Sequence, residues 1–216
     1  MKILHIYAKS SLDVLPVVCK AIPKLGKKVG VLTTIQHLHK MHDVVKFLEK
    51  SGRKAFGLGQ VLGCKIPDTT NVDSLLYIGT GKFHPRGIVL QGREVVMADP
   101  LTETVTILKP SDMDNLKKRK KGALMKFYNA EVVGVLCTTK GQNFFNKKSL
   151  FHEAMKLQKR FPEKQFYYFA SSTLSFNEME NFPFIECWVN CMCPRLDEDL
   201  EKFTKGMVNV LDIPQD

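Results

Sequence analysis

The chain is predicted to fold as an α/β protein with two similar domains. Short, continuous apolar runs alternate with helical patterns along most of its 216 residues, which is typical of mostly parallel sheets that helices cover on both faces. A weak internal repeat is the second observation, because residues 30–36 (GVLTTIQ) resemble residues 134–142 (GVLCTTKGQ). Both segments read as a strand that ends in threonines and a glutamine. The repeat predicts two copies of one α/β unit, at residues 1–110 and 111–216.

The expected strands are short apolar runs, and the expected helices lie between them. The strands are expected at residues 3–8, 29–34, 74–78, 94–98, 132–137, 165–170 and 185–189. The helices are expected at residues 12–25, 37–49, 112–129 and 147–160, of which the third is basic and amphipathic. In open α/β sheets, ligands bind beyond the carboxyl ends of the strands. That rule predicts functional rims at residues 34–36, 79–84, 138–142 and 190–195.

The composition is that of a soluble globular protein, with 44% apolar and 25% charged residues. No apolar run is long enough to cross a bilayer, and the amino terminus lacks the features of a secretory signal, so a cytoplasmic location is expected. The net charge of +10 suits an acidic partner, but a lysine-rich solvated surface would give the same value. The basic run at residues 117–121 has the same two interpretations. Because no aromatic-interleaved RNA motif accompanies it, direct nucleic-acid binding is not expected.

The six cysteines are expected to be reduced, since disulfides are rare in the cytoplasm. Small apolar filler is the expected role of Cys19, Cys137 and Cys187. Cys64 and Cys193 differ, because both lie in loops where strands end, and thiols at equivalent loop positions can converge on one metal centre. Iron–sulfur clusters are held by such thiolates.

A local cluster site is the alternative at the carboxyl-terminal end of the chain. Cys187, Cys191 and Cys193 form a C-x-x-x-C-x-C array, which nearly matches the C-x-x-x-C-x-x-C pattern of many radical enzymes. The final spacing differs, and Cys187 belongs to a predicted strand. A cluster shared between the two halves of the chain is therefore the preferred hypothesis.

Two further patterns are weaker. His37, His39 and His42 have the chemistry of zinc ligands, but no acidic or thiol ligand completes the set, so a polar surface or a pocket wall is expected. Gly79-x-Gly81 after a strand could hold a phosphate through backbone amides, although it lacks the complete glycine fingerprint. His84 could act as an acid or base, or could cap the following turn.

Five segments together resemble the diphthamide synthesis family, whose members are 2-(3-amino-3-carboxypropyl)histidine synthases. They occur in family order, at residues 31–40 (VLTTIQHLHK), 59–64 (GQVLGC), 76–85 (LYIGTGKFHP), 139–142 (TKGQ) and 189–195 (VNCMCPR). The resemblance implies a fold of three similar α/β domains, each of which gives one cysteine to a shared 4Fe–4S cluster. This chain then corresponds to the second and third domains, two thirds of that fold.

The resemblance also implies a reaction and a site. Cys64 is implied as the second-domain ligand and Cys193 as the third-domain ligand, and three thiolates leave one iron open for S-adenosylmethionine. Such enzymes form a 3-amino-3-carboxypropyl radical and add it to a histidine of translation elongation factor 2. Arg195 is expected to neutralise the methionine carboxylate. The expected pocket donors are polar side chains in or near these segments: Gln60, Gln142 and His84.

The family's first domain, with its cysteine, has no counterpart in this sequence. A partner chain could supply it, giving a split enzyme, or Cys191 could replace the lost ligand. Alternatively, the protein is a non-catalytic, shortened paralogue that binds elongation factor 2 or a full-length homologue. The split enzyme is preferred, because Cys191 and Cys193 could bind different irons only from a very short loop. We therefore expect the iron–sulfur subunit of a 3-amino-3-carboxypropyl transferase, which acts with a partner chain or as a homo- or heterodimer.

Overall fold

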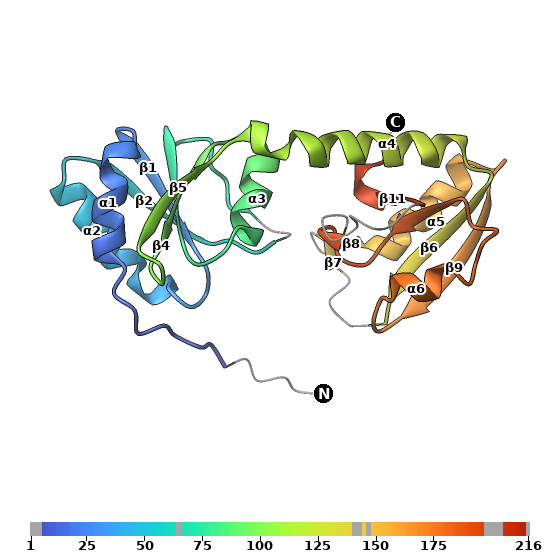
Figure 1. Ribbon diagram of the computed structural model, residues 1–216, viewed down its shortest axis with the longest axis horizontal. Helices are drawn as coiled ribbons and strands as arrows, with labels where there is room; N and C mark the ends of the chain where they lie inside the picture. Colours follow the sequence, from blue (N-terminus) through green and yellow to red (C-terminus); the bar gives the residue numbers. More distant parts are fainter. Residues whose placement is uncertain (1–5, 64–65, 140–143, 146–147, 197–204, 215–216) are drawn as a thin grey trace. The chain divides into compact units, whose positions relative to one another are not determined.

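The computed structural model describes residues 6–63, 66–139, 144–145, 148–196 and 205–214 (Figure 1). The chain divides into two compact units, Met1–Met113 (unit 1) and Asp114–Asp216 (unit 2). Each unit contains its own sheet and its own buried core. The α/β class expected from the alternation of apolar runs and helical patterns is confirmed.

Unit 1 contains a five-stranded sheet in the order β2-β1-β3-β4-β5. The first four strands in this order are parallel, and β5 pairs with β4 in the antiparallel direction. The strands are β1 (Lys28–Thr33), β2 (Lys54–Gln60), β3 (Ser74–Ile78), β4 (Val95–Asp99) and β5 (Thr104–Leu108). Five of the six residues of β1 are buried, as expected for a central strand that is covered on both faces.

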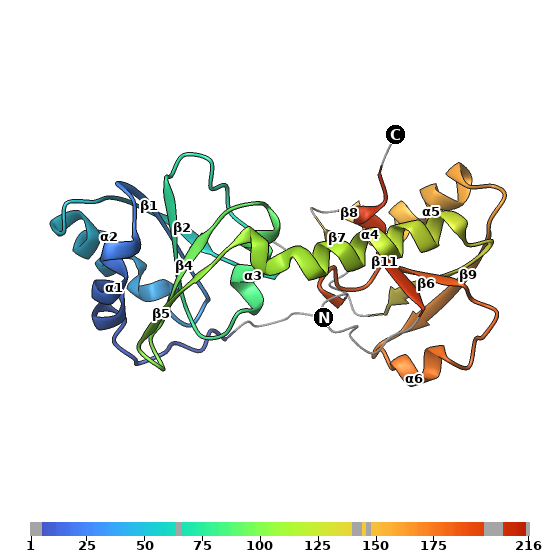
Figure 2. The same ribbon diagram turned by 45° about the horizontal axis from the view of Figure 1, so that its top comes forward.

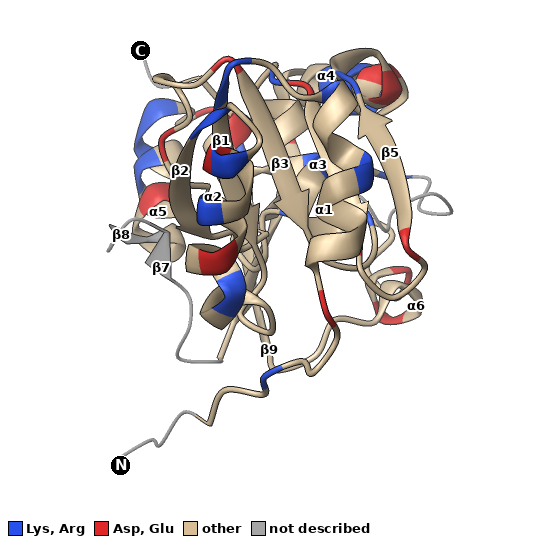
Figure 3. Ribbon diagram, turned by 90° about the vertical axis from the view of Figure 1, so that its left-hand side faces the viewer, with Lys and Arg blue, Asp and Glu red and all other residues tan. Residues whose placement is uncertain are grey.

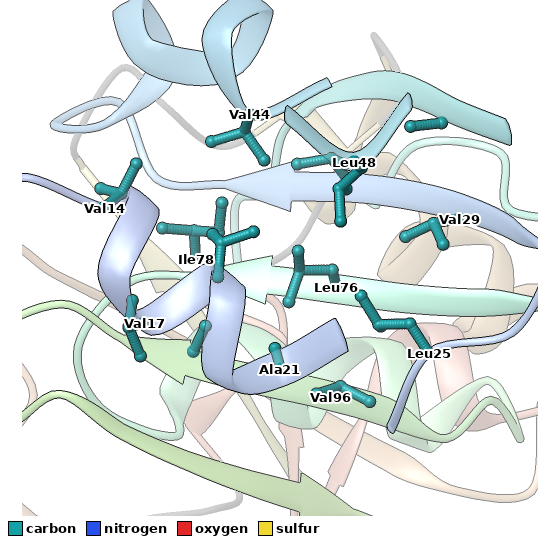
Figure 4. Packing of buried hydrophobic residues seen from close by; sticks show 14 residues of the cluster. Val14, Val17, Ala21, Leu25, Val29, Val44, Leu48, Leu76, Ile78 and Val96 are labelled. Atoms are coloured by element: carbon teal, nitrogen blue, oxygen red, sulfur yellow. The ribbon is translucent and has the colours of Figure 1, made fainter. Parts of the chain in front are cut away.

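Helices cover both faces of this sheet. The helices α1 (Leu15–Ala21) and α2 (Met41–Lys50) pack on one face, and α3 (Phe83–Leu90) packs on the other. Figure 4 shows the first of these cores, in which side chains of α1 and α2 meet those of β1, β3 and β4. Val44 and Leu48, one helical turn apart on α2, are both fully buried, because residues at this spacing share one face of a helix.

Unit 2 contains a four-stranded parallel sheet in the order β11-β10-β6-β9. Its strands are β6 (Val132–Thr138), β9 (Gln165–Ser171), β10 (Cys187–Asn190) and β11 (Gly206–Asn209). The helices α4 (Asp114–Asn129) and α5 (Leu150–Arg160) cover one face, and α6 (Phe176–Met179) packs against the other. Figure 2 shows α4 lengthwise. The described residues also include the short antiparallel strands β7 (Phe144–Phe145) and β8 (Lys148–Ser149) and the 3₁₀ helices Ile22–Lys24, Leu38–Lys40, Pro110–Met113 and Val210–Asp212.

The two sheets repeat one topology, as the sequence repeat predicts. The order β2-β1-β3-β4 in unit 1 corresponds to β9-β6-β10-β11 in unit 2, and all of these neighbouring strands are parallel. Gly30 on β1 pairs with Leu75, and Gly134 on β6 pairs with Trp188. In unit 1 two helices, α1 and α2, pack on one face of β1, and in unit 2 two helices, α4 and α5, pack on the corresponding face of β6. The antiparallel strand β5 belongs to unit 1.

Several local expectations are wrong. The expected strand at residues 3–8 does not form where the chain is described, since residues 6–8 lie outside any strand and Ile6 and Tyr7 are exposed. The strands β2, β5 and β11 and the helix α3 were not predicted. Gly57 and Gly59 interrupt the apolar pattern of β2, while β5 is an exposed edge strand, so neither shows a continuous apolar run. Among the described residues, no helix has the length and apolar character to span a membrane.

Candidate functional site

The carboxyl ends of parallel strands form one rim on each unit. In unit 1 the rim contains the turns after β1, β2, β3 and β4, and in unit 2 it contains the turns after β6, β9, β10 and β11. Because β10 corresponds to β3, the loop that carries Cys193 corresponds to residues 79–84 of unit 1. In the sequence the Cys64 segment follows β2, whose counterpart in unit 2 is β9. Cys64 itself lies outside the described residues.

The thiol-bearing loop of unit 2 begins where β10 ends at Asn190. Cys193 is exposed in this loop, and the neighbouring Arg195 is buried. The Asn190 side-chain amide makes two hydrogen bonds to the backbone of this loop. Its Oδ1 accepts from Met192 N at 2.8 Å, and its Nδ2 donates to Cys193 O at 2.7 Å. The loop therefore presents an accessible thiol on a backbone that is fixed by a buried side chain.

Asn209, the last residue of the adjacent strand β11, extends this network. Its Oδ1 accepts a hydrogen bond from Asn190 Nδ2 at 2.6 Å, and its Nδ2 donates to Pro194 O at 2.8 Å. The same Nδ2 lies 3.2 Å from Asp212 Oδ2, and Lys120 of α4 pairs with that carboxylate at 3.0 Å. Asn209 was not predicted as a site residue, because its strand β11 was not predicted either.

The other cysteines of unit 2 point into its core. Cys191 is fully buried, and burial raises the pKa of its thiol, with a further contribution from Cys137. Burial also raises the pKa of Cys187 to about 12. Cys137 is buried as well, so the filler role expected for Cys137 and Cys187 is confirmed. Since Cys187 and Cys191 are buried while Cys193 is exposed, the three do not present one set of ligands.

Cys19 differs from the expectation. Cys19 lies on α1 and is exposed. The prediction that it is buried apolar filler is therefore wrong. The buried residues of α1 are Val17, Val18 and Ala21, and Cys19 lies on the opposite side of this short helix. A lone cysteine within an apolar segment gives no indication of which helical face it occupies.

The rim of unit 1 is built around the turn after β3. Thr33 Oγ1 donates to Ile78 O at 2.8 Å, which ties the end of β1 to the end of β3. Gly79 closely covers the buried Tyr77 side chain, since a Cβ at residue 79 would lie 2.7 Å from the Tyr77 hydroxyl. Asp99 at the end of β4 accepts from Thr80 Oγ1 at 3.1 Å. The turn is therefore braced from both neighbouring strands.

Glycine is required in this turn for two reasons. At Gly79 a side chain would collide with Tyr77, and at Gly81 the backbone has a φ of +78°, a left-handed conformation that other residues rarely adopt. Burial raises the pKa of the Tyr77 hydroxyl, and the nearby Asp99 carboxylate raises it further. Tyr77 is therefore a neutral phenol at neutral pH.

The histidines of unit 1 do not form a zinc site in the described part of the chain, where no group of three or more possible metal ligands is found. His37 is buried, whereas His39 and His42 are exposed. Burial lowers the pKa of His37, and the charges of Lys40 and His39 lower it further, against a weaker opposing effect of Asp99. His37 is therefore a buried side chain that is neutral at neutral pH.

The remaining predicted site residues lie on both rims. Gln60 is half-buried at the end of β2, where it pairs with Thr33. His84, in the first turn of α3, is half-buried and lies edge-on to Phe83 with ring centroids 5.3 Å apart. Gln142 lies outside the described residues. Arg195 is buried and already has an interaction partner within the chain.

The basic run at residues 117–121 lies on α4. Lys120 pairs with Asp212, and Lys117 lies 3.5 Å from Asp114, while Lys118 and Lys121 are exposed. Basic residues also occur on α1, α2 and α5 (Figure 3). This distribution matches a lysine-rich solvated surface.

Comparison with known proteins identifies relatives over most of the chain. The family described as "Putative diphthamide synthesis protein" matches residues 1–213. The 2-(3-amino-3-carboxypropyl)histidine synthase of Pyrococcus horikoshii is 29% identical over 190 residues, which cover 82% of this chain and 53% of that protein. Subunit 1 of the Caenorhabditis elegans synthase is 26% identical, over 81% of this chain and 46% of that protein. The chain thus spans about half the length of these relatives.

Solved structures agree with the sequence comparison. The crystal structure of Dph2 from Pyrococcus horikoshii matches with a TM-score of 0.79 and 25% identity, over 94% of this chain and 62% of that chain. The structure of the same protein with a 4Fe–4S cluster matches with a TM-score of 0.78 and 25% identity.

Proposed function

Because the chain belongs to the diphthamide synthesis protein family, we propose that it carries thiolate ligands of an iron–sulfur centre in a 2-(3-amino-3-carboxypropyl)histidine synthase. The substrates are S-adenosylmethionine and a histidine of translation elongation factor 2, and the site of action is the cytoplasm. The observation that carries the proposal is the exposed Cys193 thiol on a braced loop at the carboxyl end of β10. A family relative has been crystallised with a 4Fe–4S cluster.

The residues at this rim fit an iron–sulfur cluster. Iron binds thiolates, and Cys193 is an accessible thiol in the described part of unit 2, whereas Cys137, Cys187 and Cys191 are buried. We propose Cys64 as the second ligand, by its match to the family motif. Burial makes Cys191 a poor third ligand, since its thiol packs inside the core and resists ionisation. The third thiolate is therefore proposed to come from outside this chain's 216 residues, for example from a partner chain.

A bound 4Fe–4S cluster would supply the electron that cleaves S-adenosylmethionine. The chain's own residues would hold and orient the substrates. Arg195 follows the ligand loop directly, and its guanidinium can bind a carboxylate in a bidentate manner. Because Arg195 is buried with a partner in place, the methionine carboxylate would have to replace or join that partner. Three further side chains are proposed as polar groups around the substrate: Gln60, His84 and Gln142.

Anaerobic reconstitution with iron and sulfide tests the metal site. The proposal expects a brown protein, alone or mixed with a chain that contains the first domain of a family member. Cys193→Ala and Cys64→Ala should each lose most of the iron. Cys19→Ala is the matched control, because Cys19 is also exposed but lies on α1, and it should bind as much iron as the original protein. A colourless protein in both preparations would contradict the proposal.

A second candidate function follows from the length of the relatives. Since the chain spans about half of each, it could bind elongation factor 2 or a full-length homologue without catalysing the transfer. This candidate predicts that the double variant Cys64→Ser/Cys193→Ser captures elongation factor 2 or the homologue as well as the original chain does. It also predicts no transfer of the 3-amino-3-carboxypropyl group from labelled S-adenosylmethionine by either protein. Transfer that the serine substitutions abolish would exclude it.

A further inference from the structure

The loop after β10 is fixed at three consecutive residues. Met192 donates its N–H to Asn190 Oδ1, Cys193 O accepts from Asn190 Nδ2, and Pro194 O accepts from Asn209 Nδ2. Pro194 has no N–H of its own, so this part of the loop cannot be stabilised as a continuing strand. Side-chain amides provide the partners that a neighbouring strand would otherwise provide. The exposed thiol of Cys193 thus extends from a backbone held on both sides.

The orientation of the Asn190 amide follows from the backbone groups around it. A backbone N–H can only donate, so the Asn190 oxygen faces Met192, and its nitrogen therefore faces Cys193 O and Asn209 Oδ1. Both protons of the Asn190 amide are used. The side chain is only 2% exposed, so the bonds are made away from water, where a lost partner is costly.

The Asn209 amide nitrogen likewise donates both of its protons. The Asn209 oxygen accepts from Asn190, and the nitrogen donates to Pro194 O and to Asp212 Oδ2. The two asparagines stand at paired positions of neighbouring parallel strands, in the register Val189↔Val208 and Asn190↔Asn209. Asn209 is 4% exposed. Two strand ends therefore join through one pair of hydrogen-bonded amides, and each amide nitrogen donates two hydrogen bonds.

We propose that Asn190 and Asn209 are positioning residues that hold the Cys193 thiol in a fixed orientation for iron ligation. The inference rests on the proposed function, because it assigns the asparagines a task for the same metal site. Groups that hold a metal ligand in place commonly change metal affinity tenfold or more when they are replaced. The asparagines are assigned no ligating role, because both side chains are buried and hydrogen-bonded to the loop backbone.

Isosteric substitutions test the pair without changing its volume. Asn190→Asp keeps the acceptor for Met192 N but removes both donors, and Asn209→Asp likewise keeps the acceptor for Asn190. Asn181→Asp is the matched control, because Asn181 is exposed in the same unit and the charge changes equally. Asn209→Ala is a second variant, which removes the hydrogen bond to Pro194 O without adding a charge. It replaces the aspartate variants in the test if these do not fold.

The first measurement is backbone hydrogen exchange of the protein without iron. Losing one or two buried hydrogen bonds should accelerate exchange in residues 191–196 by about tenfold, with no change in β6. Leu196 is a specific probe, because its N–H donates to Cys193 O at 3.0 Å. Exchange in this segment equal to that of Asn181→Asp would overturn the proposal, whether or not the protein binds iron.

The second measurement is alkylation of individual cysteines after anaerobic reconstitution, read by peptide mass spectrometry. In the original protein the cluster should protect Cys193 but not the exposed Cys19, and in the Asn190 and Asn209 variants the protection should fall about tenfold. Cys191 should stay unreactive throughout, because reaction at this buried thiol would report opening of β10 instead. Equal protection in variants and original would overturn the positioning role. Absence of protection in the original protein would contradict the proposed function, and hydrogen exchange would still decide whether the amides hold the loop.

Discussion

Gly134 lies directly against the indole ring of Trp188, with which it is paired across β6 and β10. A Cβ atom at residue 134 would lie 2.5 Å from Trp188 Cε3 and 2.6 Å from Cζ3. Unit 1 shows the same relationship at the paired residues Gly30 and Leu75, where the corresponding distance to Leu75 Cδ2 is 3.1 Å. Both units therefore place a large apolar side chain over a glycine in the middle of the central strand.

Gly134→Ala should destabilise unit 2, because the fully buried Trp188 ring cannot move without repacking its neighbours. Overpacking of this kind costs about 1–3 kcal/mol. Chemical denaturation followed by tryptophan fluorescence measures the change, since Trp188 is the chain's one tryptophan. Gly122→Ala is the matched control. Gly122 is exposed within α4 with open space around it, so alanine there should stabilise the helix by about 0.5–1 kcal/mol. Equal effects of the two substitutions would contradict the explanation.

Thr33→Val should weaken the turn after β3. The substitution keeps the shape of the side chain but leaves Ile78 O without the hydroxyl that donates to it at 2.8 Å inside the protein. The expected loss is about 1–3 kcal/mol in the free energy of unfolding of unit 1, measured by thermal or urea denaturation. Thr106→Val on the exposed edge strand β5 is the control and should change stability by less than about 0.5 kcal/mol. A Thr33→Val protein as stable as the control would show that the hydrogen bond contributes little.

The repeated β/α topology could be predicted from sequence because its central strands are buried on both faces. Residues 29–32 and 132–137 are continuous apolar runs, and they lie within β1 and β6. The edge strands were harder to predict. β2 is interrupted by two glycines and β5 is mostly exposed, so neither carries the pattern of a buried strand. The amino-terminal run at residues 3–8 is apolar, yet its described part, Ile6 to Ala8, is exposed and unpaired, which no local pattern indicates.

The sequence motif contains the thiol loop but only one of the two asparagines that hold it. Cys193 and Asn190 belong to one motif, whereas Asn209 comes from a strand that was not predicted. A signal was present, since Trp188-Val189-Asn190 and Met207-Val208-Asn209 both end in Val-Asn and pair in register. That pairing becomes visible only once β10 and β11 are known to be neighbours. The structure was also needed to show that Cys193 is exposed while Cys191 is buried. The two cysteines are only two residues apart in one predicted loop, and the sequence of a loop does not indicate which side chains point into the core.

Unit 2 should lose stability at alkaline pH because its buried thiols stay protonated. Burial raises the pKa of Cys187 from 9.0 to about 12, despite opposing effects of the Trp188 backbone, Lys126 and Lys164, and it raises that of Cys191 as well. Above about pH 9 the unfolded chain releases protons that the folded chain retains. The stability contributed by each thiol is therefore complete below that pH and falls by up to about 1.4 kcal/mol per pH unit as the pH rises toward the folded pKa.

Cys187→Ala and Cys191→Ala test this dependence. Each should flatten the slope of unfolding free energy against pH by about 1.4 kcal/mol per unit between about pH 10 and 11. Below about pH 8 the difference between each variant and the original protein should stay constant, because the thiols are protonated in both states. Identical slopes for all three proteins at high pH would contradict the role of these thiols. Urea denaturation at a series of pH values provides the measurement.

The ion pair between Lys120 and Asp212 should be coupled to the asparagine pair. Lys120 Nζ lies 3.0 Å from Asp212 Oδ2, the carboxylate oxygen that also accepts from Asn209. Lys120→Ala should cost about 0.5–1 kcal/mol, as for a partly exposed pair, whereas Lys118→Ala on the exposed face of α4 should cost almost nothing. A double-mutant cycle of Lys120→Ala with Asn209→Ala should give a coupling energy of at least about 0.5 kcal/mol, because both side chains share one carboxylate. If the free-energy changes of the two single variants add up to that of the double variant, the Lys120–Asp212 ion pair does not stabilise the cysteine loop. The hydrogen-bond network of this loop would then end at Asn209.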